Sequence, residues 1–71
     1  MERLLRLSVE HERVIRLMLF QDGRLTQVNA RVIAYDEEQI EFITTRSPRP
    51  QRVLRADLLA ADFRKGDDGQ V

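Results

Sequence analysis

The alternation of apolar and polar residues predicts a short helix at the start of the chain and a strand directly after it. Residues 2–11 carry apolar side chains at loose helical spacing, which predicts about two to three turns. A helix this short is unstable alone in water, so we expect it to pack against the rest of the domain. Residues 13–20 form a β-prone run that is apolar on both faces, with Ile15, Leu17 and Leu19 on one and Val14, Met18 and Phe20 on the other. The second face needs a cover, which we expect to be either the helix or a neighbouring subunit.

Turn signals divide the next part of the chain into two further strands. Residues 21–24 contain Asp22-Gly23, a pair that two-residue hairpins favour because glycine tolerates positive φ. Strands are predicted over 26–35 and 40–45. The turn between them, 36–39, begins with an aspartate, which suits the first position of a type I turn.

Prolines interrupt the last third of the chain. Residues 47–50 hold Pro48 and Pro50, which cannot donate to a ladder, so a loop is predicted there. A short strand at 51–55, a single helical or 3₁₀ turn at 56–59 and a closing strand at 60–65 follow, and 66–71 is expected to be a disordered tail. The predicted fold is mainly β: one domain over residues 1–65, built as a small five-stranded SH3-like or Sm-like barrel with a short N-terminal helix and one helical turn before the last strand. Barrel closure would remove the free strand edges.

Two segments resemble a known family. LLRLSVE at residues 4–10, followed by RVIRL at 13–17, resembles the opening of WYL domains, in which a short helix runs into a strand before a glycine-bearing hairpin. QRVLRADLL at 51–59 is similar to the closing segment of that family, which reads roughly R-x-F-R-L-D-R-I. The resemblance spans about residues 3–60. It implies an SH3/Sm-like barrel and an association with bacterial regulation, through sensing of a ligand or nucleic acid on a basic surface.

The same comparison shows departures from the family pattern. The Trp-Tyr-Leu triplet that names the family is absent, and its place would fall near residues 40–42. Val32 stands where many members have proline, and Leu58 stands where the closing segment has its second arginine-type residue. We therefore expect a degenerate, stand-alone form of the domain, without a helix-turn-helix.

Composition narrows the class of protein. The 71 residues contain 12 Lys+Arg and 12 Asp+Glu, so the formal net charge is zero. This balance excludes a protein that functions only as a polycation. Without cysteine there is neither a disulfide framework nor a thiolate metal site. The sequence lacks a secretory signal and the ~20 apolar residues of a membrane span, so we expect a cytoplasmic protein with no membrane contact. A domain this small often needs a second copy or a partner for stability.

The candidate binding residues are arginines. Arg46, Arg49, Arg52 and Arg55 recur at every third position, and no acidic residue occurs over 42–56. Guanidinium groups there could hold phosphates, with hydroxyl donors from Thr44, Thr45 and Ser47. The alternative is four ordinary solvated arginines, because strand alternation directs the last two to opposite faces.

Tyr35 is the other candidate for the site. It lies on the predicted outward register of strand 26–35 and would be the exposed platform on which a base could stack. The alternative is a tyrosine at the rim of the barrel that needs no ligand.

No catalytic or metal-binding arrangement is visible in the sequence. Ser8 and His11 could touch on the helix, but a nucleophile also needs a group that orients its base and an oxyanion site. We therefore predict a non-enzymatic, regulatory bacterial binding module without cofactor or metal. Its predicted ligand is single-stranded nucleic acid or a small anion. The alternative is a protein–protein interaction or oligomerisation module with no nucleic-acid role, and a homo-oligomer or a protein partner is expected in either case.

Overall fold

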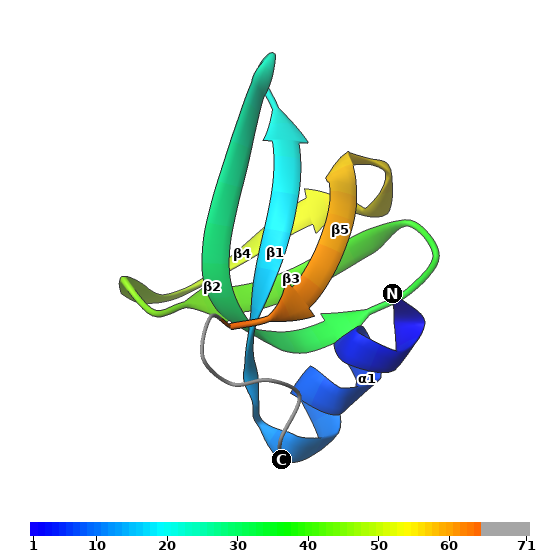
Figure 1. Ribbon diagram of the computed structural model, residues 1–71, viewed down its shortest axis with the longest axis vertical. Coiled ribbons are helices and arrows are strands. Elements are labelled where there is room, and N and C mark those ends of the chain that lie inside the picture. The colour runs from blue at the N-terminus through cyan, green and yellow to red at the C-terminus, as the bar shows by residue number, and fades with distance from the viewer. Residues whose placement is uncertain (65–71) are drawn as a thin grey trace.

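A computed structural model describes residues 1–64 of the chain, and its elements follow the predicted order (Figure 1). The elements, in chain order, are α1 (Glu2–His11), β1 (Val14–Gln21), β2 (Arg24–Tyr35), β3 (Gln39–Thr44), β4 (Ser47–Leu54), the 3₁₀ turn η1 (Arg55–Asp57) and β5 (Leu58–Phe63). The predicted fold class is confirmed in these features: mainly β, five antiparallel strands, an N-terminal helix and a short turn before the last strand. The predicted tail over 66–71, and residue 65 of the predicted closing strand, lie outside the described residues.

The five strands form one antiparallel sheet in the order β4-β3-β2-β1-β5. The sheet is strongly bent, so that the β1–β2 hairpin rises beyond the other strands while β3 and β4 cross behind it (Figure 1). The end strands β4 and β5 do not pair with each other in the described part of the chain. The sheet is therefore not closed by hydrogen bonds, and the expectation that closure removes its free edges is not met.

The β1–β2 hairpin has the predicted two-residue turn. Gln21 pairs with Arg24, which leaves Asp22 and Gly23 at the tip with φ angles of 53° and 72°. Two successive positive φ angles are typical of a type I′ turn, whose twist matches that of the strands. The turn fixes the register of the whole hairpin, in which Ile15 lies opposite Ala30.

One face of the bent sheet forms the core. One of the two apolar faces of β1 is buried, and so are side chains from every other strand and from α1: Leu5, Ile15, Leu17, Leu19, Ala30, Val32, Ile40, Phe42, Val53 and Leu58. Helix α1 packs on this core side, because its Leu5 belongs to the core cluster. It does not cover the outer face of β1, where Val14 and Met18 are half-buried and Phe20 is 47% exposed. Of the two expected covers for that face, the helix is excluded.

The two prolines lie inside strand β4, so the predicted loop over 47–50 is wrong. Gln51 pairs with Phe42 and Ser47 pairs with Thr44, which places three residues, 48–50, opposite Ile43 alone. Strand β4 is at the end of the sheet. A proline is tolerated in an edge strand because its missing N–H can face away from the ladder.

A register shift in β2 reverses the predicted orientation of its last residues. Pairing with β3 is interrupted between Val32 and Ala34, which is the position of a β-bulge. Beyond it, Ala34 is exposed, whereas Tyr35 pairs with the buried Ile40 and packs against the core. The predicted outward register of Tyr35 is therefore wrong.

Candidate functional site

The four arginines predicted to bind a ligand do not form one surface. Arg46 lies in the β3–β4 turn and Arg49 lies on the edge strand β4, and both are exposed. Arg52 lies opposite Glu41 in the register of β4 and β3, and the Nη2 and Oε2 atoms of this pair are 3.9 Å apart. Arg46 and Arg49 make no ion pair within residues 1–64. These two are therefore the candidates still free to meet a ligand.

Arg55 is held by groups of its own chain. Its Nη1 donates to the carbonyl oxygen of Asp36 at 2.8 Å, and its Nη2 donates to Oε1 of Glu2 at 2.5 Å. Its guanidinium also lies 5.7 Å from the centroid of the Tyr35 ring. The side chain is only 20% exposed. The structure thus places Arg55 beside Tyr35, and the two predicted site residues contact each other within the fold.

The turn beside Arg55 is stabilised by a carboxylate. Oδ1 of Asp36 accepts the N–H of Glu38 at 2.8 Å and that of Gln39 at 2.9 Å. The hydrogen bond from Gln39, then that from Glu38, and to a lesser degree the charge of Arg55 hold the pKa of Asp36 below its ordinary value. This is the predicted turn at 36–39, and it positions the carbonyl that receives Arg55.

Arg46 lines a cleft between the β1–β2 hairpin and the β3–β4 turn. We name this cleft of about 400 Å³ the Arg46 cleft; its walls are Thr26, Gln27, Val28, Asn29, Thr44, Thr45, Arg46, Ser47 and Gln51. The predicted group of Arg46 with the hydroxyls of Thr44, Thr45 and Ser47 is therefore brought together. No carboxylate and no aromatic side chain is among these residues. A positive charge among uncharged polar groups suits an oxyanion.

The β2 wall of this cleft was not predicted from the sequence. Gln27 and Asn29 alternate with smaller side chains in β2, a pattern that indicates a solvated strand face. Gln51 is separated from them by more than twenty positions in the chain. The bend of the sheet brings residues 26–29 of β2 and Gln51 to the cleft, and no local motif in the sequence indicates that bend.

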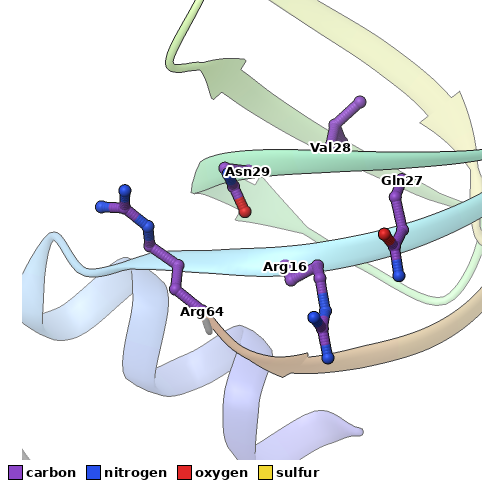
Figure 2. A pocket seen from close by; sticks show the side chains of 5 residues that line it. All are labelled: Arg16, Gln27, Val28, Asn29 and Arg64. Atoms are coloured by element: carbon purple, nitrogen blue, oxygen red, sulfur yellow. The ribbon is translucent and has the colours of Figure 1, made fainter. Parts of the chain in front are cut away.

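A second cleft adjoins the first on the outer face of the hairpin. It measures about 330 Å³ and is lined by Arg16, Gln27, Val28, Asn29 and Arg64 (Figure 2). Figure 2 shows that the Val28 side chain points to the opposite side of β2 from those of Gln27 and Asn29. Arg16 is already paired, because its Nη2 lies 3.3 Å from Oδ2 of Asp62. Of the two guanidinium groups in this outer cleft, the one of Arg16 is therefore held by a carboxylate, whereas Arg64 is exposed.

The serine that could have served as a nucleophile has a structural role. Ser8 is fully buried; its hydroxyl donates to the carbonyl of Arg13 at 2.6 Å and accepts the N–H of Val32 at 2.8 Å. His11 is exposed at the end of the helix. Between residues 1 and 64, His, Asp and Glu form no group of three or more that could hold a metal ion. No helix of that region is long and apolar enough to cross a membrane.

The chain was also compared with known proteins. Protein-family models, curated proteins and solved structures gave no match. The resemblance to WYL domains therefore stays a prediction.

Proposed function

We propose that this protein is a non-enzymatic binding module with a regulatory role, and that it holds the phosphate groups of an anionic ligand in the Arg46 cleft. The observation that carries the proposal is the composition of that cleft: one unpaired guanidinium, the hydroxyls of Thr44, Thr45 and Ser47, and no carboxylate. Arginine binds phosphate through two parallel hydrogen bonds, and neighbouring hydroxyls donate to the remaining oxygens. Arg49, exposed on the adjoining strand, adds positive charge nearby.

Single-stranded nucleic acid and small phosphorylated molecules are the two ligand classes with this chemistry. No aromatic residue lines the cleft, and the ring of Tyr35 faces Arg55. Recognition would therefore depend on phosphates and not on base stacking, and it would be insensitive to nucleotide sequence. Of the arginines predicted to bind, Arg46 and Arg49 are assigned this role, whereas Arg52 and Arg55 are assigned to ion pairs within the fold.

The proposal is tested by titrating the protein with twelve-nucleotide single-stranded RNA and DNA, and with inorganic phosphate, at two salt concentrations. Log affinity for the oligonucleotides should fall with log salt by about 0.7 per phosphate contacted. Arg46→Ala should weaken binding and lower that slope by about 0.7. Arg24→Ala, at the exposed tip of the hairpin, is the matched control and should leave the slope unchanged. Absence of binding at low salt, or equal effects of the two substitutions, would refute the proposal.

A second candidate function is supported by a different observation. Phe20 and Leu25 face each other across the β1–β2 hairpin and are 47% and 61% exposed. Large apolar side chains gathered at a projecting hairpin are typical of interaction surfaces. The second candidate is therefore a protein-interaction module, self-associating or with another protein. Sedimentation tests self-association: a strictly monomeric species at 100 µM would exclude a homo-oligomer.

A further inference from the structure

Strand β2 has a free edge in the middle of the sheet. Strand β1 pairs with β2 over Arg24–Arg31, but β3 joins the other side of β2 only from Ala30 onward. Over residues 25–28, the side of β2 that faces away from β1 therefore has no strand partner in the described structure. At about 3.4 Å per residue, Leu25–Asn29 offers an open edge about 17 Å long.

The register identifies the backbone groups on this edge. Gln21 and Arg24 close the two-residue turn as a hydrogen-bonded pair, and such pairs alternate along an antiparallel ladder with pairs whose backbone groups point outward. Leu25, Gln27 and Asn29 belong to the outward set. Asn29 confirms this assignment of the outward residues, because its carbonyl accepts the N–H of Thr45 at 3.0 Å. The open groups are thus the N–H and C=O of Leu25 and Gln27 and the N–H of Asn29.

The edge of β4 and one backbone N–H of β5 carry features that hinder strand addition, whereas this edge carries none. Strand β4 carries Pro48 and Pro50, which lack donors. In β5, the N–H of Phe63 is taken by Oδ1 of Asp62 at 2.8 Å. Prolines and charged groups of this kind prevent unwanted strand pairing, and residues 25–28 contain neither.

The open edge also forms one wall of the Arg46 cleft. Thr26 to Asn29 line the cleft on one side, and the β3–β4 turn with Arg46 lines it on the other. A ligand lying along the edge would satisfy the backbone groups of β2 and place a side chain near the guanidinium. An extended polypeptide has the alternating donors and acceptors that this edge needs, and a nucleic acid does not.

We propose that the Arg46 cleft receives an extended peptide, which adds to residues 25–29 of β2 as an extra strand and places an acidic side chain near Arg46. This inference rests on the second candidate function and names its partner class: a segment in β conformation with at least one Asp or Glu. Main-chain hydrogen bonds would supply the affinity, and the arginine would supply the preference for an acidic residue.

The test uses a capped heptapeptide of alternating threonine and valine with glutamate at its centre, titrated into the isotope-labelled chain and followed by amide chemical shifts. Two further forms carry N-methyl groups, either on its odd-numbered or on its even-numbered residues. In an added strand only alternate N–H groups face the protein, so one methylated form should bind like the parent. The other should bind about tenfold more weakly or not at all, because it loses at least two hydrogen bonds.

Variants of the protein test the same pairing between the peptide and residues 25–29 of β2. Gln27→Pro removes one outward N–H, at an edge position where proline is tolerated, and should weaken the parent peptide about fivefold. Gln27→Ala keeps that N–H and is the matched control. Replacing the central glutamate of the peptide by glutamine should cost about two- to fivefold in affinity, and Arg46→Ala should abolish this difference.

The outcomes separate this inference from the phosphate proposal. Equal binding of the two methylated peptides, or no binding of the parent peptide at millimolar concentration, would overturn strand addition. If the oligonucleotides or phosphate still bind through Arg46, the first proposed function stands on its own. The methylated peptides decide the matter even if Gln27→Pro fails to fold, because they need only the unaltered chain.

Discussion

Replacing Ser8 by alanine should destabilise the protein far more than an ordinary helix substitution. The Ser8 hydroxyl connects three parts of the fold: helix α1, Arg13 directly before β1, and Val32 beside the bulge of β2. It accepts the Val32 N–H at 2.8 Å, next to the register shift. Alanine leaves that N–H without an acceptor in an environment where Val32 is only 1% exposed.

The expected magnitude comes from the two broken hydrogen bonds. An unsatisfied buried donor costs about 1–3 kcal/mol, and we take about 2 kcal/mol for the N–H of Val32. The carbonyl of Arg13 is only partly buried, so water can replace the serine there at little cost. Alanine recovers about 0.5 kcal/mol through its higher helix propensity. The net loss is about 1.5 kcal/mol, which lowers the Tm of a domain of this size by about 6–12 °C.

Chemical and thermal unfolding followed by circular dichroism measure this loss, and amide hydrogen exchange localises it. Arg6→Ala is the control, because Arg6 lies on the exposed side of the same helix and should change stability by less than about 0.5 kcal/mol. In Ser8→Ala, the amide of Val32 should also exchange faster relative to those of the core strands. If Ser8→Ala is as stable as Arg6→Ala, the hydroxyl does not anchor the bulge and the reasoning is refuted.

Three further predictions follow from single residues. Glu12→Gly should raise the free energy of unfolding by about 0.5–1 kcal/mol in urea titrations, because Glu12 has a φ of 50° at the end of α1. Asp36 contributes stability that is fully present above about pH 4 and is lost as the pH falls through its lowered folded-state pKa, so Asp36→Asn should flatten the acid limb of the pH–stability profile. Arg55→Lys should lower the free energy of unfolding by about 1 kcal/mol, because lysine cannot bridge Glu2 and the Asp36 carbonyl together. Half of that loss or more should disappear in 1 M NaCl, where the ion pair between Arg55 and Glu2 is screened.

Features set by local chemistry were predictable from the sequence. The Asp22-Gly23 pair specifies a two-residue turn, and the alternation in β1 specifies that Ile15 and Leu17 share one face; the structure has both. Residues 36–39 form the predicted turn for the same reason, since the side chain of Asp36 bonds to backbone two and three residues later. In each case the interacting groups lie within a few positions of one another.

Features that depend on distant parts of the chain were not predictable. No glycine or other local signal precedes the bulge at Val32 that turns Tyr35 toward the core. Whether prolines interrupt a strand depends on whether that strand lies at an edge, and β4 does. One of the two acceptors of Arg55 is Glu2, which lies at the N-terminal end of the chain, 53 positions away. For the candidate site, the local cluster around Arg46 was visible in the sequence, whereas its wall in β2 was not.

The bend of β2 connects the stability of the fold to the candidate site. The strand has twelve residues, and it pairs with β1 through its first part and with β3 through its last part. Because β3 joins only from Ala30, the β3–β4 turn diverges from the hairpin tip and leaves the Arg46 cleft between them. The bulge that follows between Val32 and Ala34 is stabilised by the hydroxyl of Ser8 in helix α1, which accepts the N–H of Val32. A change at Ser8 therefore acts on the same bend that opens the cleft, even though Ser8 is not among the residues that line it.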